Sequence, residues 1–379
     1  MLELPPLSLY VHIPWCARKC PYCDFNSHRM PDNLPEQAYV RALINDLNQE
    51  LEWVQGRKIQ SIFIGGGTPS LFSADSIERI LQEVQQRVGF EEQIEITLEA
   101  NPGTAEQQKF ADFKTAGINR LSIGVQSFDN DHLNTLGRIH DQEQSLRAIE
   151  MAQQVEFNQI NIDLMHGLPN QNQHSAKSDL EIAINSGVKH ISWYQLTLEP
   201  NTEFYSKPPP LPAEDQLADI QDQGQLCLKE AGFQQYEVSA FALDGAVSKH
   251  NINYWQFGDY LGIGAGAHGK ISLPDNNTVL RSNKTRQPDH YLDSVDNPRA
   301  HIKPVDANQL PLEFMMNALR LRSGVPIEFF SKRTGLSTDS INRQIVDLQR
   351  KGLLEKESAN LCASDLGYRF LNSLLQHFS

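Results

Sequence analysis

Three cysteines near the start of the chain have a spacing suited to metal chemistry. Cys16, Cys20 and Cys23 follow the pattern C-x3-C-x2-C, so three thiolates converge from one short loop with no fourth cysteine nearby. An iron–sulfur cube contains four irons and normally takes four cysteine ligands. Three ligands leave one iron open to bind a small molecule, as a catalytic zinc keeps one position open for a reactant. We therefore expect a reactive [4Fe–4S] cluster held by these three cysteines.

The cysteines could also serve in a zinc site or in a disulfide. A structural zinc would need a fourth ligand, and His28 could supply it. A disulfide is less favoured, because the chain has five cysteines in 379 residues and its start, Met-Leu-Glu-Leu-Pro-Pro, does not resemble a signal peptide. We therefore expect a reducing, cytoplasmic location, in which Cys227 and Cys362 are ordinary thiols.

Further candidate groups follow strand-like runs. The sequence Gly65-Gly66-Gly67-Thr68-Pro69 can present backbone N–H groups to a carboxylate or carbonyls to an ammonium. Four further polar residues occur at or near the ends of successive strand-like runs, and they are Glu99, Gln126, Arg138 and Asp163. Each could by itself cap a helix or lie in solvent. Their repetition at successive strand ends predicts one shared binding site.

The elements that would position these groups alternate regularly over the first two hundred residues. The strand-like runs are Leu7–Ile13, Ser61–Gly66, Glu95–Ala100, Arg120–Gln126, Gln159–His166 and His190–Thr197. The helix-like stretches are Glu36–Trp53, Ala74–Val88, Ala105–Thr115, Asp141–Val155, Ser175–Ser186 and Ala213–Ala231. Six β-α units in series imply an α/β fold with a parallel sheet, whose working face lies at the carboxyl ends of the strands.

The cysteine spacing after Tyr10, together with the Gly65–Pro69 segment, resembles the radical S-adenosylmethionine (SAM) superfamily. More narrowly, it is similar to the branch of oxygen-independent coproporphyrinogen III oxidases and HemW heme chaperones. The resemblance implies a partial (β/α)6 barrel, a [4Fe–4S] cluster on the three cysteines, and SAM chelated to the open iron. It also implies that Gly66, Gly67 and Thr68 line the methionine end of SAM. Tyr10, Glu99, Gln126, Arg138 and Asp163 would fix the rest of the cofactor.

Three features bear on the branch. The oxidases carry a further cysteine two positions after the third, where this chain has Phe25, and a longer extension before the first strand, where it has Met1–Pro6. The segment His250-Asn-Ile-Asn-Tyr-Trp255 resembles the H-N-x-x-Y-W signature of the heme chaperones. The resemblance implies heme binding there, with His250 as a tentative iron ligand and His268 as a second candidate. From residue chemistry alone, a buried aromatic loop with a hydrogen-bonded His250 is favoured, since most histidines are not ligands.

Three regions are expected along the chain. Residues 1–240 would form the barrel with the cluster and SAM site, and residues 241–305 a connecting region with the heme motif. Residues 306–379 would form a small winged-helix-like α+β domain that caps the barrel. Its expected elements are helices at Leu310–Leu321, Ile327–Thr334 and Thr338–Lys351, a hairpin starting at Gly352, and a helix at Asp365–Phe378.

Three functions compete. The first is a heme chaperone that passes heme to acceptors such as respiratory enzymes, with an electron donor for its cluster. The second is a radical oxidase that decarboxylates coproporphyrinogen III, and the third is a redox regulator that binds DNA. The formal net charge of −14 argues against nucleic acid, and no apolar run could span a bilayer, so at most peripheral membrane association is expected. Phe25 and the His250 motif favour the chaperone without oxidase activity, and no catalytic residue is assigned.

Overall fold

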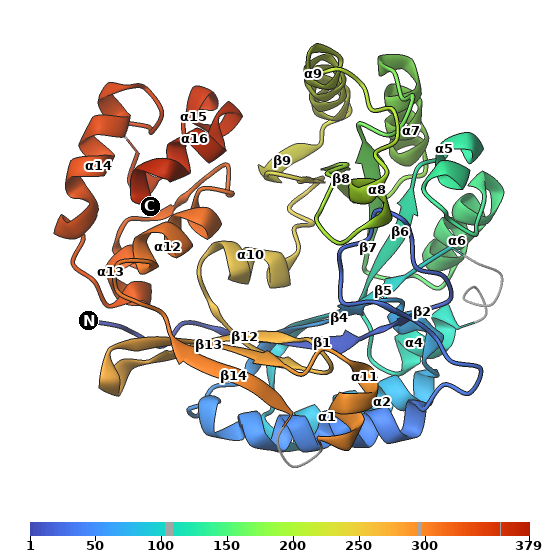
Figure 1. Cartoon of the computed structure of the whole chain (residues 1–379), viewed down its shortest axis with the longest axis horizontal. Helices are drawn as coiled ribbons and strands as arrows, with labels where there is room; N and C mark the ends of the chain where they lie inside the picture. The colour runs from blue at the N-terminus through green and yellow to red at the C-terminus, as the bar shows by residue number, and fades with distance from the viewer. Residues whose placement is uncertain (103–108, 295–297, 357) are drawn as a thin grey trace.

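A large mixed sheet organises the chain in the computed structural model, which describes residues 1–102, 109–294, 298–356 and 358–379. Within these residues the sheet has twelve strands (Figure 1). From one edge to the other they are β14 (Arg299–Pro304), β13 (Thr278–Lys284), β12 (His268–Leu273), β11 (Asp259–Ile263), β1 (Leu7–Ile13), β4 (Ile59–Gly66), β5 (Phe90–Ala100), β6 (Arg120–Gln126), β7 (Gln159–His166), β8 (His190–Gln195), β10 (Ala240–Ala242) and β9 (Gln234–Glu237).

The six central strands, β1 and β4 to β8, run parallel, which confirms the predicted α/β class. Their apolar side chains are buried, as in Leu9, Val11 and Ile13 of β1, because helices cover the sheet. The outer neighbour of β1 is β11 and that of β8 is β10, so the six units form an open, partial barrel. The carboxyl ends of all six strands meet at one edge, where a shared site is expected.

The helices that follow these strands start close to where the sequence predicts. They are α1 (Glu36–Glu50), α2 (Ala74–Arg87), α6 (Gln142–Gln154), α7 (Gln173–Asn185) and α9 (Glu214–Glu230). The side chains of Asp141 and Asn172 cap α6 and α7. Of the helix predicted at Ala105–Thr115, residues 105–108 lie outside the described residues, and α4 covers Phe110–Thr115. No helix in the described part of the chain is both long and apolar enough to cross a membrane.

The segment between residues 234 and 304 extends the sheet at both edges, which the sequence analysis did not predict. β11 adds to β1 in parallel, and β12, β13 and β14 follow it antiparallel. The predicted boundary at residue 240 falls inside β10. Two short helices also belong to this segment, α10 (Lys249–Trp255), which carries the heme motif, and α11 (Pro288–Asp293). β12, β13 and β14 pair with their neighbours along the chain, whereas β11 pairs with the distant β1 and so joins them to the sheet.

Buried ion pairs attach this extension to the barrel. Lys284 of β13 donates to Asp46 and Glu50 of α1, with both Nζ–O distances at 2.5 Å, and all three side chains are fully buried. Arg299 of β14 pairs with the same Glu50 at 2.9 Å. Removing one partner of such a pair leaves an uncompensated buried charge, so α1, β13 and β14 are held together as a unit.

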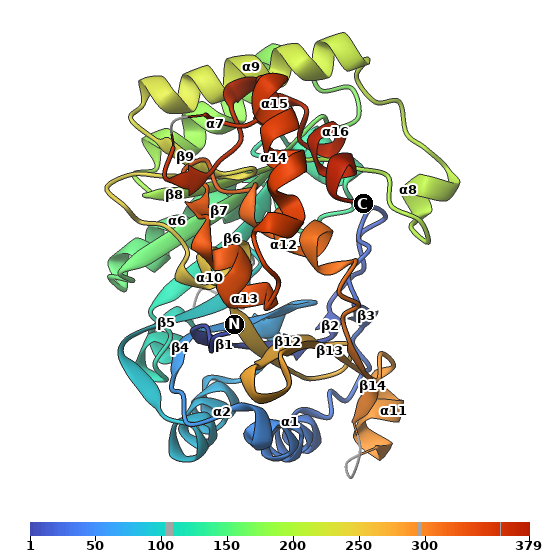
Figure 2. The same ribbon diagram turned by 90° about the vertical axis from the view of Figure 1, so that its left-hand side faces the viewer.

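The last seventy residues form a small module of helices around a second core. Its helices are α12 (Leu310–Ala318), α13 (Glu328–Thr334), α14 (Asp339–Arg350), α15 (Asp365–Arg369) and α16 (Leu371–Leu375), grouped at one end of the molecule (Figures 1 and 2). The predicted hairpin is reduced to a bridge between Leu354 and Ala363, while β15 (Val325–Pro326) pairs with β16 (Asn360–Leu361). The predicted single helix at the end breaks at Phe370, whose backbone is not helical.

Candidate functional site

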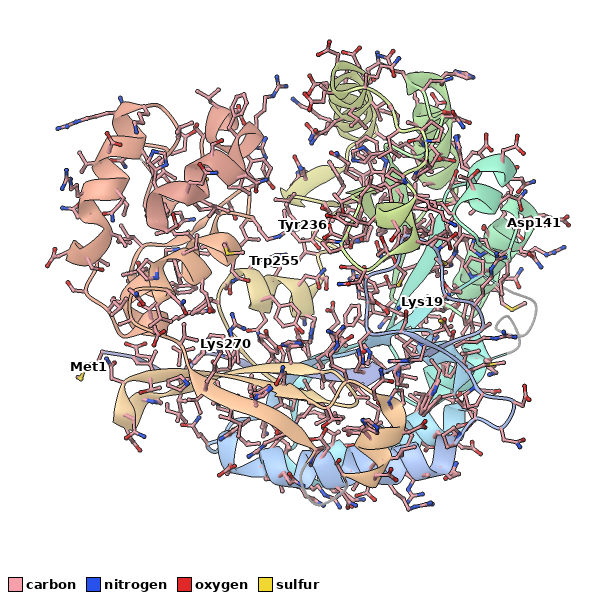
Figure 3. All side chains as sticks on the ribbon, in the orientation of Figure 1. Met1, Lys19, Asp141, Tyr236, Trp255 and Lys270 are labelled. Carbon is pink, nitrogen blue, oxygen red and sulfur yellow. The ribbon has the colours of Figure 1, made fainter. Side chains whose placement is uncertain are left out.

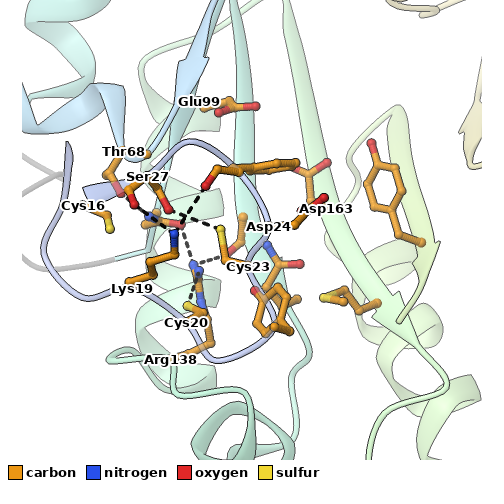
Figure 4. A pocket seen from close by; sticks show the side chains of 18 of the residues that line it. Cys16, Lys19, Cys20, Cys23, Asp24, Ser27, Thr68, Glu99, Arg138 and Asp163 are labelled. Carbon is orange, nitrogen blue, oxygen red and sulfur yellow. Dashed lines mark hydrogen bonds between the residues drawn. The ribbon is translucent and has the colours of Figure 1, made fainter. Parts of the chain in front are cut away.

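A cavity of about 350 Å³ lies at the carboxyl ends of the parallel strands (Figure 4). Cys16, Cys20 and Cys23 line it together with most of the residues predicted for cofactor binding. Those residues are Gly66, Gly67, Thr68, Glu99, Gln126, Arg138 and Asp163. The structure therefore brings into one cavity groups that are almost 150 residues apart in the sequence. Tyr10 and His250 are not among its lining residues.

The cysteine loop is closed at its base by backbone pairing. The short strand β2 (Trp15–Cys16) pairs in parallel with β3 (His28–Arg29), and Met30 N donates to Cys16 O at 3.0 Å. Across the loop, Lys19 Nζ donates to Ser27 O at 3.0 Å. Burial and the neighbouring thiols raise the pKa of Cys16 to about 11, so metal binding would have to displace its proton.

The cysteine side chains suit a cluster better than a single ion. In the described part of the chain, no three His, Cys, Asp or Glu side chains converge tightly enough to hold one metal ion. In a cube each thiolate binds a different iron, so its cysteines need not meet at a point. His28, the proposed fourth zinc ligand, instead places Nε2 3.3 Å from Asn26 Oδ1. The three thiols at one cavity wall therefore fit a [4Fe–4S] cluster.

The glycine loop lies directly against the backbone that precedes the cysteines. A Cβ on Gly67 would lie 2.3 Å from Trp15 O, and one on Gly66 would lie 2.7 Å from the His12 ring, so neither position has room for a side chain. Gly66 also has a φ of +123°, which other residues rarely adopt. Its N–H donates to Glu99 Oε2 at 3.0 Å, while Thr68 Oγ1 accepts from Asn101 Nδ2 at 2.8 Å.

Two of the predicted ligands are carboxyl groups, in a cavity that Asp24 and Glu199 also line. Burial, and then the nearby Asp163, raise the pKa of Glu99 to about 8 against the effect of the Gly66 N–H. Burial also raises the pKa of Asp163, although Ser122 Oγ and Asn161 Nδ2 each donate to it at 2.8 Å. Carboxyl groups that resist ionisation in an empty cavity become favourable ligands when a cation enters. The pair therefore fits an ammonium or sulfonium group.

Arg138 supplies the opposite charge at the cysteine side. Its Nη2 donates to Gly124 O at 2.8 Å and also to Asn101 Oδ1, and its Nη1 lies 3.8 Å from Cys20 Sγ. Within the described residues its buried Nε has no hydrogen-bond partner. A buried guanidinium N–H without an acceptor fits a ligand carboxylate.

Tyr10 lies behind the cavity wall. Its hydroxyl is 2.9 Å from His12 Nδ1, and its ring stacks on Phe63 with centroids 6.4 Å apart. Burial, and then Glu99, raise the pKa of the phenol. Tyr10 therefore lies near Glu99, outside the cavity lining, and its contact with SAM stays a prediction.

The sequence analysis missed the polar residues that orient the predicted ones. Asn101 bonds both Thr68 and Arg138, and Ser122 and Asn161 hold Asp163. Ser122 and Asn161 could have been found from the sequence, because each precedes a candidate ligand, Gln126 or Asp163, by an even number of positions on the same strand. Side chains alternate between the two faces of a strand, so such residues share a face.

The heme motif forms a short helix whose polar side chains face the protein. Ser248 caps α10 by accepting from Asn251 N at 3.3 Å. The buried His250 places Nδ1 3.1 Å from Ser61 Oγ and Nε2 2.8 Å from Tyr254 Oη, and burial lowers its pKa to about 3. Both ring nitrogens thus have partners in this conformation, as expected for a buried aromatic segment. His268, the second candidate, is exposed at the start of β12.

Two family models and several whole proteins resemble this chain. The family model of the radical SAM superfamily matches residues 10–183, and that of the HemN C-terminal domain matches residues 305–370. The heme chaperone HemW of Escherichia coli (strain K12) is 48% identical over 383 aligned positions, which cover 100% of this chain and 99% of that protein. The mitochondrial radical S-adenosyl methionine domain-containing protein 1 of Bos taurus is 36% identical over 97% of this chain and 86% of its own.

Among solved structures, the coproporphyrinogen III oxidase HemN from Escherichia coli, described as a radical SAM enzyme, is similar with a TM-score of 0.83. The match covers 99% of this chain and 90% of that one at 22% identity. At this identity the likeness establishes a shared fold, including the open sheet and the helical C-terminal module.

Proposed function

This chain belongs to the HemW family of heme chaperones within the radical SAM superfamily, and from that membership we propose that it binds heme and passes it to acceptor proteins. The observation that carries the proposal is the 48% identity to the Escherichia coli heme chaperone HemW across the whole chain. Because the match covers the whole chain, it spans both the cysteine loop and α10. Respiratory enzymes, which need heme, are the class of acceptor that we propose.

The cavity at the strand ends is proposed to hold a [4Fe–4S] cluster and SAM. Its fit rests on three thiols at one wall, on the carboxyl groups of Glu99 and Asp163, and on the guanidinium of Arg138, whose buried Nε has no hydrogen-bond partner in the described part of the chain. Cys16, Cys20 and Cys23 would hold the cluster. When bound, the cluster can donate an electron at its open iron and SAM offers a sulfonium that can accept it. An electron-donor protein would reload the cluster.

The surrounding side chains would bind and orient SAM. Gly66 and Gly67 let its methionine end approach the backbone, and Thr68 adds a hydroxyl beside them. Glu99 and Asp163 would compensate its positive charge, while Arg138 and Gln126 would bind its polar groups. Phe25 is 61% exposed and lines the same cavity, so an apolar ring stands where the oxidases are expected to carry a cysteine.

We further propose that heme binds beside α10. Ligation of its iron by His250 would require that the 2.8 Å hydrogen bond to Tyr254 be broken, whereas the exposed His268 can reach a ligand without such a change. A neutral imidazole is the form that binds iron. The pKa of His250 is lowered by burial, and that of His268 is lowered by the partial burial of its ring and by the nearby Arg281 and Arg286, so both histidines favour that form.

The test is a titration of anaerobic, cluster-loaded protein with hemin, followed by its Soret band, beside an incubation with coproporphyrinogen III, SAM and a reductant. We expect saturable hemin binding and no decarboxylation. His250→Ala and His268→Ala should identify the ligand by a spectral shift, with His174→Ala, an exposed histidine on α7, as the control. Absence of saturable hemin binding would refute the chaperone proposal. Steady formation of protoporphyrinogen would refute it in favour of an oxidase.

A further inference from the structure

A second cavity, of about 190 Å³, lies where α10, the extended sheet and the C-terminal module meet. Tyr254 and Trp255 reach it from α10, Lys270 and Arg281 from β12 and β13, and Asn317 from α12. Figure 3 labels Trp255 and Lys270 in this region, between the sheet and the C-terminal helices. The cavity therefore borders the predicted heme motif on the side away from the cysteine loop.

The volume of this cavity suits a single short substituent of a ligand rather than a whole ligand. Pockets that enclose a whole drug-sized molecule measure roughly 300–1,000 Å³, and this cavity, at about 190 Å³, is smaller. A porphyrin ring would have to lie outside it. A short side chain of a ring, such as a propionate, would fit inside.

The cavity offers hydrogen-bond donors beside aromatic rings. Arg281 Nε and Nη2 donate to the same oxygen of Glu313, at 3.0 and 2.7 Å, and Nη1 donates to Tyr260 Oη at 2.8 Å. A guanidinium has five N–H groups, so further donors stay available, and this side chain is 28% exposed. Within the described residues, the buried indole Nε1 of Trp255 has no hydrogen-bond partner. Both groups can only donate, which selects an acceptor such as a carboxylate.

The electrostatic surroundings also favour an anion. Lys270 is fully buried and donates to Asp259 Oδ1 and to Phe257 O, each at 3.0 Å. Asp259 is shared with Arg57 at 2.8 Å, and Arg333 lies close enough to influence both Asp259 and Lys270. Three cations thus surround one carboxylate beneath the cavity, and their excess charge is poorly screened because the groups are buried.

A chain of contacts joins Arg281 to the heme motif. Arg281 donates to Tyr260, whose ring meets the Tyr254 ring edge-on with centroids 4.5 Å apart. Tyr254 in turn lies 2.8 Å from His250 Nε2. A flat ligand packed against the α10 aromatics would therefore bring its edge to Arg281.

We propose that this cavity receives a carboxylate arm of the porphyrin, with Arg281 as its principal anchor and the Trp255 indole as a second donor. The inference rests on the proposed heme binding and adds to it the residue that distinguishes a porphyrin acid from its neutral analogue. Glu313 would share Arg281 with the ligand, so its carboxylate competes with the ligand for the same positive charge.

The experiment compares hemin with hemin dimethyl ester, in which both carboxylates are masked, on cluster-loaded protein. Hydrogen bonds to a charged group are worth about 1.5–3 kcal/mol, or about tenfold to hundredfold in affinity. Arg281→Gln should weaken hemin binding by about that factor and leave ester binding nearly unchanged. Glu313→Gln should strengthen hemin binding, because it removes the competing carboxylate. The matched control is Arg322→Gln, since Arg322 also pairs with a carboxylate and lies over a tyrosine ring.

The outcomes separate this inference from the proposed function. If wild-type protein binds neither porphyrin, both fail. If it binds hemin and the ester equally well, or if Arg281→Gln weakens both alike, heme binding stands and the carboxylate site is wrong. Equal hemin affinity in wild type and Arg281→Gln also overturns the site. Opposite changes in Arg281→Gln and Glu313→Gln, confined to hemin, would support it, since a loss of folding would weaken both.

Discussion

Replacing Glu99 by glutamine should make the folded protein more stable at alkaline pH while weakening SAM binding. Glu99 accepts from Gly66 N at 3.0 Å, and the carbonyl of glutamine can accept the same bond. The substitution therefore preserves the local geometry. It removes a carboxyl group whose pKa is raised to about 8 by burial and by Asp163.

The direction in which stability changes with pH follows from the number of protons that the folded and unfolded proteins bind. A carboxyl whose pKa is higher in the folded than in the unfolded protein binds more protons when folded. The free energy of unfolding therefore falls as the pH rises from the ordinary pKa of 4.5 to about 8, and is level above that. At 1.36 kcal/mol per pKa unit the whole shift is worth at most about 5 kcal/mol. Because Glu99 is only half-buried, solvent should reduce this, and we expect about 2–3 kcal/mol.

The assay is urea unfolding of wild type and Glu99→Gln from about pH 5 to about pH 8.5. The stability difference should grow with pH in favour of the variant. Glu143→Gln, which changes an exposed carboxylate on α6, should follow the wild type throughout. A difference that stays constant with pH would refute the raised pKa of Glu99.

The same carboxyl should make SAM binding depend on pH. A bound cation favours the ionised form of Glu99, so binding should release a proton and strengthen as the pH rises to about 8. In Glu99→Gln calorimetry should show weaker binding and no such rise. Equal pH dependence in both proteins would place the SAM cation elsewhere.

Two further predictions concern the cysteines of the proposed cluster and Arg138 beside them. Cys20→Ser should abolish the visible absorption of the reconstituted cluster, whereas Cys227→Ser should retain it; an intact cluster in Cys20→Ser would contradict the assignment. Arg138→Gln should weaken SAM binding about tenfold in calorimetry without loss of iron, because it removes a charge-assisted hydrogen bond. Unchanged affinity would show that the ligand carboxylate binds another group.

The sequence was informative wherever the determining interactions are local. The spacing of Cys16, Cys20 and Cys23 places three thiols on one short loop whatever the rest of the chain does. Strand periodicity likewise predicts that Glu99 and Asp163 lie toward the carboxyl ends of buried parallel strands, and parallel strands end at a common edge. The partial barrel and most of the candidate ligands in its cavity could therefore be predicted from the chain alone.

The remainder depends on contacts between distant segments, which local patterns do not encode. His250 has the chemistry of a ligand, and the packing of α10 on β4 brings Ser61 to its Nδ1, while Tyr254, one turn further along α10, lies against its Nε2. β11 and β10 attach the strands after residue 234 to the two edges of the parallel sheet. Arg281 is unremarkable in the sequence, and it lines a cavity with Trp255 only because β13, α10 and the C-terminal module converge. Residue type and spacing specify which chemistry is available, but tertiary burial decides which groups are free to use it.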